Sequence, residues 1–556
     1  MNGQTDGGHT NDTRIEGIVE SLITATHSPE ELEQARSMCA GLATDNPSDP
    51  GACIVQGAVD FILGRKDEAE AWMEKAAMLS PRSPAIFYIY AVMLLARKKY
   101  TVALLLLMRV VALRPDHPRA YAQMGNALRE TGQFHSALIA FDVALKMNPK
   151  NVGALNGKGN VLKQMDCLAE AEACFQKALA IKPGHTAVMN NLAVVRSRQN
   201  DFDGAEALYE EALAAHPAFP EALSNMSAIR RFKGDIDGAI SCCQKALALR
   251  PDFPSALNNL GNALKDAGRL EEAVAAYRDA LRLTPNDANV RNNLAMALLA
   301  LGAFEEGWRE YRWRWKSDHL KASFRNLSEP EWQGEAGEGR TILIHAEQGF
   351  GDTIQFCRYA PLVKGRGFKV VMLVPRPLQR LVASLDGVER VASGPGEIPD
   401  FDVQCPMMNL PLAFGTTVAT IPQALPYLSP DPADAARWRE CLKGVEDGKW
   451  KVGLAWAGRS RAQSPDLVAT DRKRSIAPEM LAPLFTVPNV RFFSLQKEGP
   501  SVPIDFALTD WMADCRDFAD TAALIANLDL VIAVDTAVVH LAGALGKPVW
   551  LLNRFN

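Results

Sequence analysis

A proline recurs every 34 residues through the first three-fifths of this 556-residue chain. The register holds through eight occurrences, at Pro47, Pro81, Pro115, Pro149, Pro183, Pro217, Pro251 and Pro285. A period of this length is typical of a repeat array in which each unit is one supersecondary element. The first part of the chain is therefore expected to fold as stacked units, not around one central core.

Other columns in the same register predict two packed helices in each unit. Small residues, which bring two helices close, recur at Gly125, Gly159, Ala193, Ser227, Gly261 and Ala295, and rings that fill the groove recur at Phe141, Phe175, Tyr209 and Tyr277. Proline ends the second helix, and glycine at 132, 234, 268 and 302 supplies a left-handed turn. This pattern resembles the tetratricopeptide repeat, which implies an α-helical superhelix over residues 16–321 with a degenerate first unit and a capping last one. The polar segment 1–15 is expected to be a disordered tail.

A column of asparagines lies at the sixth place of the predicted first helices, at Asn191, Asn225, Asn259 and Asn293. The amide offers both donors and acceptors, so such a column suits the backbone of an extended polypeptide. The column resembles the asparagine ladder of the protein O-linked N-acetylglucosamine transferases, which implies a polypeptide partner in a concave groove. The alternative is that these amides bond neighbouring helices, and the column is interrupted at Gln123 and Gly157.

Composition narrows the class of protein. The formal net charge of −5 gives no case for nucleic acid as a partner. Ten cysteines are scattered without a CxxC pair, which is typical of small buried side chains in a reducing compartment. The N-terminus lacks the apolar core of a signal peptide, and no apolar run is long enough to cross a bilayer. We therefore expect a cytoplasmic protein without a transmembrane segment.

After residue 303 the pattern changes, and α/β alternation replaces the repeats. A tryptophan-rich helix over 304–320 is expected to dock on a second domain, followed by a Pro/Gly/Glu linker over 322–339. Buried strands are then predicted at TILIHAE, KVVMLV, VERVAS and FDVQCP, and after a connector at KVGLAWAG, VRFFSLQ, LVIAVD and PVWLL. The fold class is thus α followed by α/β, with two Rossmann-like lobes over 340–430 and 450–556 that face each other across a cleft.

Two loops at strand ends in these lobes are candidates for chemistry. In the first, Gly349 and Gly351 allow a tight turn and Asp352 stands near a helix N-terminus, where an aspartate is also an ordinary helix cap. In the second, Asp535 and Thr536 precede a helix whose free N–H groups suit a diphosphate, with His540 one turn further on. The alternative for the second loop is a capped helix with a histidine that faces the core.

The segments HAEQGFGDTIQF, GLAWAG, RKRS and VDTAVVHLAGALGKPVW are similar to bacterial tetratricopeptide-linked glycosyltransferases, which resemble the lipopolysaccharide heptosyltransferases. The resemblance implies two lobes of GT-B type, transfer from a nucleotide sugar as substrate, and neither a metal nor another cofactor. It makes Asp352 the base, and Asp535, Thr536 and His540 the residues that hold the donor diphosphate. Gly349 and Gly351 are expected to contact the nucleotide sugar. Arg474 and Ser475, after Arg472 and Lys473, are further donor-site candidates, as are Gln496 and Lys497. Alternatively, the basic run is a solvated turn.

The sequence departs from this family at its end, because it stops at WLLNRFN directly after a strand. Relatives continue with segments that complete the second lobe, so this lobe is expected to be truncated. The alternative function is a repeat scaffold for protein–protein interaction with an inactive transferase domain. The residues leave the donor open between an ADP-heptose and UDP-N-acetylglucosamine.

Overall fold

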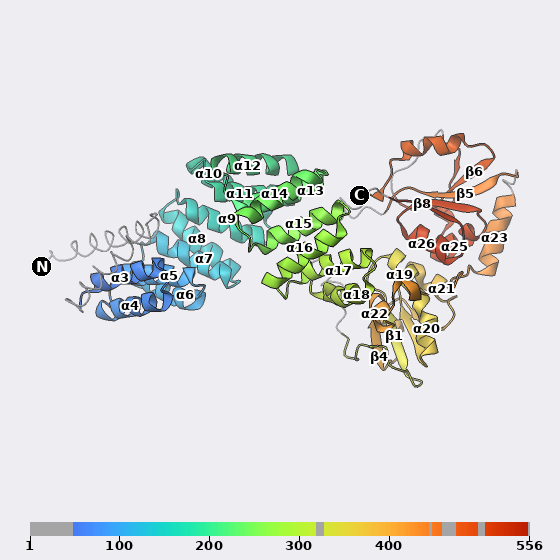
Figure 1. Ribbon diagram of the computed structural model, residues 1–556, viewed down its shortest axis with the longest axis horizontal. Helices are drawn as coiled ribbons and strands as arrows, with labels where there is room; N and C mark the ends of the chain where they lie inside the picture. The colour runs from blue at the N-terminus through green and yellow to red at the C-terminus, as the bar shows by residue number, and fades with distance from the viewer. Residues whose placement is uncertain (1–47, 318–326, 444–447, 459–473, 499–505, 554–556) are drawn as a thin grey trace. The chain divides into compact units, whose positions relative to one another are not determined.

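The computed structural model describes residues 48–317, 327–443, 448–458, 474–498 and 506–553 (Figure 1). The chain divides into two compact units, residues 1–225 and 226–556. The expected tail 1–15, the start of the first repeat unit, and Arg472 and Lys473 lie outside the described residues. The two units are described separately below.

The first unit consists of antiparallel helix pairs, as the 34-residue period predicts. Its described helices are α3 Pro50–Ile62, α4 Lys66–Leu79, α5 Pro84–Ala96, α6 Tyr100–Leu113, α7 Pro118–Glu130, α8 Phe134–Met147, α9 Val152–Gln164, α10 Leu168–Ile181, α11 Thr186–Arg198 and α12 Phe202–Ala215. Helix α13, Pro220–Lys233, contains the boundary between the units. The second unit continues the array with α14 Ile236–Leu249, α15 Pro254–Asp266, α16 Leu270–Leu283, α17 Ala288–Ala300, α18 Phe304–Tyr311 and the 3₁₀ helix η1 Arg312–Lys316.

The small-residue and ring columns pack together inside each repeat. A Cβ atom built on Gly125 would lie 2.7 Å from the ring of Phe141, and one on Gly159 would lie 2.6 Å from Phe175. In the second unit, a Cβ on Gly261 would lie 2.5 Å from Tyr277. These distances are too short for a real side chain, so glycine is needed where the ring crosses the first helix. The columns therefore predicted the core of the repeats correctly.

The turn between the two helices of a repeat is left-handed, as predicted. Gly132, Gly234, Gly268 and Gly302 have φ of 76°, 88°, 74° and 79°. Lys98, Asp166 and Asn200 occupy the same column with φ of 59°, 64° and 67°. A residue with a Cβ is disfavoured in this region, so the packing of the two helices holds these three turns in place.

The first helices of neighbouring repeats lie on the inner side of the stack. Helix α7 contacts α9, and α9 contacts α11, in addition to the contacts that each makes with its own second helix. Elements on the inside of a curved stack are closer to one another than those on the outside. In the second unit, α15 contacts α17 in the same way. The members of the asparagine column lie on first helices, so each lies along the inner side of its own unit.

The N-terminal lobe is a four-stranded parallel sheet in the order β3-β2-β1-β4. Its strands are β1 Thr341–His345, β2 Lys369–Leu373, β3 Val388–Ala392 and β4 Val403–Pro406, and its main helices are α19 Phe350–Phe356, α20 Ala360–Gly365 and α21 Gln379–Val382. Ile342 pairs with Val370 on one side and with Val403 on the other. The buried apolar strands that the sequence predicted thus form this sheet.

The described part of the expected linker belongs to this lobe. Glu331 forms a parallel bridge to Gln404 of β4, and Trp332 N–H donates to the Gln404 carbonyl at 2.8 Å. The Trp332 ring is 1% exposed and packs edge-on against Phe368 and Phe414, at 5.6 and 5.3 Å between centroids. A large apolar ring in a Gly/Glu-rich segment gains free energy by entering a nearby core, so residues 327–339 are not a free linker.

The C-terminal lobe is a five-stranded parallel sheet in the order β7-β6-β5-β8-β9. Its strands are β5 Trp450–Ala455, β6 Val490–Ser494, β7 Leu508–Thr509, β8 Leu530–Val534 and β9 Val549–Leu552, with helices α25 Phe518–Ala526 and α26 Ala537–Ala544. The short strand β7 was not predicted. Helix α23, Pro432–Lys443, was also missed, although Asp431 caps it by accepting from Ala433 and Asp434 N–H. None of the helices in the described ranges is both long and apolar enough to cross a membrane.

Candidate functional site

The glycine-rich loop joins β1 to α19. Helix α19 begins at Phe350 with Gly349 as its N-cap, and Asp352 occupies the third position of the first turn. The Asp352 carboxylate accepts the Gly349 N–H at 3.1 Å, so it stabilises the helix start from within. The capping role that was the alternative for Asp352 is therefore present in the structure. The side chain is half-buried and remains close to the loop surface.

The same loop is anchored by the last turn of the repeat array. Arg314 Nη2 lies 2.8 Å from both carboxylate oxygens of Glu347, and both side chains are buried, at 0% and 1% exposed. The guanidinium is flanked by the rings of Tyr311 and Trp315, at 4.7 and 4.3 Å from their centroids. Gln348 donates to the Tyr311 hydroxyl at 2.7 Å. The tryptophan-rich helix thus docks on the α/β region as expected, and it does so through the loop that carries Asp352.

Burial changes the pKa of Glu347 in its pair with Arg314, which we call the anchor. Burial raises the pKa of the Glu347 carboxyl, while Arg314 and the Met408 N–H, which donates at 3.0 Å, oppose the rise. A buried carboxylate without such partners would be strongly unfavourable. Sequence reasoning missed Arg314, Glu347, Tyr311 and Gln348 as partners. The only signal was an arginine among aromatic residues next to a domain boundary.

The second loop joins β8 to α26, and Thr536 is the N-cap of this helix. The Thr536 hydroxyl is buried, makes no capping bond, and has no hydrogen-bond partner within the part of the chain that the structure describes. Asp535 is exposed, and its Oδ1 lies 3.7 Å from His540 Nε2. A helix start with an unused hydroxyl suits an anion such as a phosphate, because both offer donors to it.

The two loops lie against each other. A Cβ built on Gly351 would lie 2.8 Å from His540 Cδ2 and 3.6 Å from the Cα of Ala537. Helices α19 and α26 pack together here, and Phe350 packs on Phe518 with 5.2 Å between ring centroids. His540 therefore faces the glycine-rich loop, where the alternative had it facing the core. The structure brings together Gly349, Gly351, Asp352, Asp535, Thr536 and His540.

The other donor-site candidates lie along the same edge of the C-terminal sheet. Arg474 and Ser475 border Gly458, which follows β5, and Gly458 N–H donates to the Ser475 hydroxyl at 3.4 Å. Gln496 follows β6, and its Oε1 accepts from Trp456 and Ala457 N–H at 3.0 Å each. Its amide nitrogen donates to the Ala457 carbonyl at 2.9 Å and to that of Glu498. The Gln496 side chain thus holds the end of β5.

Lys497 also has a local structural role. Its ammonium donates to the carbonyls of Met512 and Cys515, at 2.7 and 2.5 Å. These bonds fix the segment between β7 and α25. Lys497 is an exposed residue, so its charge contributes to the potential at this edge of the sheet while its hydrogen bonds go to the backbone.

The asparagine column connects neighbouring repeats. Asn191 donates to Asn156 at 2.9 Å and Asn225 donates to Asn190 at 3.0 Å, both within the first unit. Asn293 donates to Asn258 at 3.0 Å within the second. Each bond joins residues 35 positions apart, from one first helix to the preceding one. The structural alternative for this column is therefore present, and Asn259, the remaining member, lies at the equivalent place on α15.

An ion-pair network joins the two lobes beside the site. Arg380 of α21 pairs with Asp517 at 3.0 Å, with Asp520 at 3.7 Å, and with Asp434 of α23. Arg437 and Arg516 also pair with Asp520, at 3.2 and 2.7 Å. The Asp520 side chain is 0% exposed, and its bonds to Arg516 lower its pKa to about 2. This network fixes α21 of one lobe to α25 of the other.

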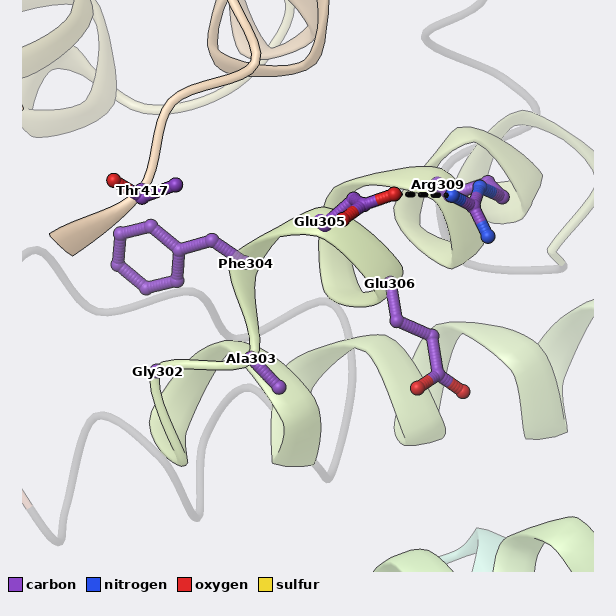
Figure 2. Close-up of a pocket in the computed structure, with 7 residues that line it drawn as sticks. All are labelled: Gly302, Ala303, Phe304, Glu305, Glu306, Arg309 and Thr417. Atoms are coloured by element: carbon purple, nitrogen blue, oxygen red, sulfur yellow. Dashed lines mark hydrogen bonds and ion pairs between the residues drawn. The ribbon is translucent and has the colours of Figure 1, made fainter. Parts of the chain in front are cut away.

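A hollow of about 490 Å³ lies elsewhere in the second unit, beside the turn between α17 and α18 (Figure 2). It is lined by Gly302, Ala303, Phe304, Glu305, Glu306, Arg309 and Thr417. None of the predicted site residues lines it. Among the described residues, no cluster of three or more His, Cys, Asp or Glu side chains could hold a metal ion.

Comparisons with known proteins find separate matches in the repeat region and in the α/β region. Tetratricopeptide-repeat families match residues 118–151, 152–218, 228–268 and 261–302, and glycosyltransferase family 9 (heptosyltransferase) matches residues 516–552. Protein FlbA of Caulobacter vibrioides is 28% identical over an alignment of 250 positions, and the match covers 40% of this chain and 41% of that protein. The chain thus spans about two fifths of the length of this curated relative.

Solved structures similar to parts of the chain include a TPR protein and a subunit of a larger assembly. A thermophilic TPR protein of Thermus thermophilus is 25% identical, with a TM-score of 0.31, over 33% of this chain and 100% of that one. A chain of the APC/C hetero-tetramer Cut9–Hcn1 is 17% identical, with a TM-score of 0.40, over 53% of this chain and 58% of that one. On the family matches, the chain carries tetratricopeptide repeats followed by a glycosyltransferase-like α/β region.

Proposed function

We propose that this protein is a metal-independent glycosyltransferase that moves a sugar from a nucleotide-diphosphate sugar to an acceptor hydroxyl. The observation that carries the proposal is the contact between Gly351 and His540, which places the glycine-rich loop against the start of α26. A transfer reaction needs a base for the acceptor and a site for the leaving diphosphate within reach of each other. Two parallel sheets that meet at such loops are the arrangement of a GT-B enzyme.

The start of α26 is the proposed diphosphate site. Thr536 has a buried hydroxyl without a partner among the described residues, and the first N–H groups of a helix have no acceptor within the helix. Negative charge that develops on the leaving diphosphate is stabilised by such donors, so a metal ion is not required. His540, whose Nε2 lies 3.7 Å from Asp535 Oδ1, contributes a ring N–H as a further donor.

Asp352 is the proposed base. Its carboxylate accepts one backbone N–H, which holds it in place next to Gly349. The buried pair of Arg314 and Glu347 holds the same loop five residues before Asp352. An acceptor hydroxyl that enters between Asp352 and the donor loses its proton as the bond to the sugar forms.

The repeat array is proposed to hold a polypeptide acceptor or partner along its inner side. The support is the run of asparagine amides on successive first helices, since amides hydrogen-bond an extended backbone irrespective of its sequence. Each of Asn191, Asn225 and Asn293 uses one N–H for its neighbour, which leaves a second amide hydrogen for a ligand.

Calorimetry with UDP, ADP and GDP tests the donor site. The wild-type protein is expected to bind at least one of them, and Thr536→Val should weaken that binding about tenfold through loss of one hydrogen bond to phosphate. Thr486→Val, which changes an exposed threonine of the same lobe, is the matched control and should bind as the wild type does. If none of the three nucleotides binds, or if Thr536→Val binds as tightly, the donor site is not at α26.

A second function, a non-catalytic repeat scaffold, is favoured by one observation. The glycosyltransferase family matches only residues 516–552, so the loop with Gly349, Gly351 and Asp352 lies outside the match. The nucleotide experiment separates the two functions, because a scaffold with an inactive transferase region has no reason to retain a diphosphate site that depends on Thr536.

A further inference from the structure

The inner side of the first unit carries a group of three cations on successive repeats. Lys163 lies on α9, Arg129 lies 34 residues earlier on α7, and Arg198 lies 35 residues later on α11. We call Arg129, Lys163 and Arg198 the basic site. Lys163 and Asn156 are seven residues apart on α9, which puts them on the same helix face, and Lys163 Nζ donates to Asn191 Oδ1 at 3.2 Å. The basic site is therefore continuous with the asparagine column.

Lys163 differs from its two neighbours because it has no carboxylate partner. Its one hydrogen bond goes to the neutral amide of Asn191, and within the described residues no Asp or Glu forms an ion pair with it. The side chain is half-buried. A cation removed from water without a counter-charge is unfavourable, so a carboxylate supplied by another molecule would be stabilised at this place.

The charged groups around Lys163 do not supply the missing counter-charge. Arg198 donates to the Lys163 carbonyl at 2.7 Å and pairs with Asp166, which is 76% exposed. Arg129 pairs with Glu130, which is 40% exposed, and Arg196 of α11 pairs with Glu172 of α10 at 3.4 Å. Each of these carboxylates thus belongs to an arginine. The pairs that involve the exposed carboxylates of Asp166 and Glu130 are weak and can be exchanged for a ligand carboxylate at little cost.

We propose that the basic site holds a carboxylate side chain from an acidic stretch of the polypeptide that lies along the array, with Lys163 as its central contact. The proposal rests on the proposed polypeptide-holding role of the repeats and adds the chemistry of the partner. The asparagines hydrogen-bond the backbone without regard to sequence, and the basic site selects Asp or Glu at one position along it.

Because Lys163 is the central contact, the proposal predicts that affinity for an acidic peptide depends on pH. Burial, together with the charges of Arg129 and Arg198, lowers the pKa of Lys163 to about 8. A ligand carboxylate beside the ammonium raises that pKa again, so binding takes up a proton when the pH is above 8. Affinity for an acidic peptide is then expected to fall as the pH rises, by about tenfold between pH 7 and 9.

The test uses the full chain and two fluorescently labelled peptides, an alternating Ser-Glu 16-mer and the Ser-Gln 16-mer of the same length. Fluorescence anisotropy at pH 7 is expected to show at least tenfold tighter binding of the Ser-Glu peptide. Lys163→Met should remove most of this preference. Lys177→Met, which removes an exposed lysine from the second helix α10, is the matched control and should retain it.

Lys163→Arg separates a charge effect from loss of structure. An arginine stays charged throughout the pH range, so this variant should keep the preference for the Ser-Glu peptide and lose its decline between pH 7 and 9. If the wild type binds both peptides equally well, the acidic preference is overturned, while the polypeptide-holding role of the array stands. If neither peptide binds, both proposals are overturned.

Discussion

Gly351 and His540 touch across the two lobes, and the contact leaves no room for a side chain on the glycine. A Cβ at residue 351 would lie 2.8 Å from His540 Cδ2. Atoms that close must move apart, so a Cβ here would require the His540 ring to shift, while Ala537 Cα at 3.6 Å would remain in ordinary contact. The fit between α19 and α26 therefore depends on the absence of one methyl group.

Gly351→Ala is expected to lower the free energy of unfolding by about 1–3 kcal/mol and to weaken nucleotide binding. The effect should be largely relieved when His540 is also changed to Ala, since the smaller side chain makes room for the new Cβ. Urea unfolding of the two single variants and the double variant measures the coupling. Gly543→Ala in α26 is the control, because a Cβ there meets nothing within 4 Å and should raise stability.

Arg314→Met is expected to cost about 3–5 kcal/mol of stability, because it leaves the buried Glu347 carboxylate without its counter-charge. The double variant Arg314→Met with Glu347→Gln should recover part of the loss. Arg312→Met provides the comparison, since its partner Glu331 lies at 3.3 Å in an exposed pair worth no more than about 1 kcal/mol. If Arg314→Met and Arg312→Met lose the same free energy of unfolding, the buried pair of Arg314 and Glu347 is no more stabilising than an exposed one.

Asp520 should make the stability of the second unit depend on pH at the acid end. Its folded pKa of about 2 lies below the ordinary value of 3.8, so its contribution is fully present above the unfolded pKa. This contribution, of about 2 kcal/mol, should be lost as the pH falls from about 4 to 2. Thermal unfolding of the wild type and of Asp520→Asn measures it.

In that experiment the Asn variant should be less stable at pH 6 and show a shallower decline toward pH 2. Asp386→Asn is the control, because Asp386 is 88% exposed and pairs with Lys364 at 3.4 Å. An unchanged slope in Asp520→Asn would mean that other carboxylates dominate the acid response.

Asp352→Asn is expected to abolish transfer and to leave the fold intact. The amide oxygen still accepts the Gly349 N–H, so the helix start is kept while the basic carboxylate is lost. Release of nucleoside diphosphate from the donor that binds best measures turnover, and thermal unfolding measures the cap. Parallel losses of activity and stability would show that Asp352 is a structural cap only.

Asn225→Ala is expected to cost about 0.5–1.5 kcal/mol, because it removes the hydrogen bond to Asn190 between two first helices. Asn160→Ala is the matched comparison within the first unit, since the Asn160 side chain forms no hydrogen bond in the described part of the chain. Chemical unfolding should separate the two variants. Without a difference between them, the bond to Asn190 contributes no net stability.

The repeat region was predictable because its information is local and recurs. Gly159 and Phe175 belong to columns that appear in successive units, and a pair that recurs at a fixed spacing reports a contact. The left-handed turn could be read at Gly132, but Asp166 and Asn200 adopt it without the glycine that would have revealed it. The prediction rested on glycine and therefore did not include these two turns, although they occupy the same place in the period.

The α/β region was predictable at the level of strands and loops. Buried apolar runs predicted β1 and β8, and the segments that follow them predicted the glycine-rich loop and the loop before α26. Short or atypical elements were missed, as with β7 and α23, because two residues or a Pro/Ala-rich run carry no clear period. The place of Trp332 depends on a pocket formed by Phe368 and Phe414, which only the tertiary fold creates.

The contacts between distant segments could not be read from the sequence. Arg314 and Glu347 are 33 residues apart, and neither belongs to a periodic column. The bonds along the asparagine column had a visible signal, since asparagines also stand at 156, 190 and 258, each 35 residues before a member of the column. That spacing favoured the structural alternative, but hydrogen bonding by side chains is specified only when the helices are placed.

Repeat arrays change length over evolution by gain or loss of whole units, because each unit contacts only its neighbours. The anchor between Arg314 and Glu347 sets a limit on that process here. Loss of the last unit would expose the Tyr311 and Trp315 side and leave a carboxylate uncompensated beneath the glycine-rich loop. We therefore expect units to be exchanged, duplicated or deleted ahead of Ala288, and the last repeat to be kept together with the transferase-like region.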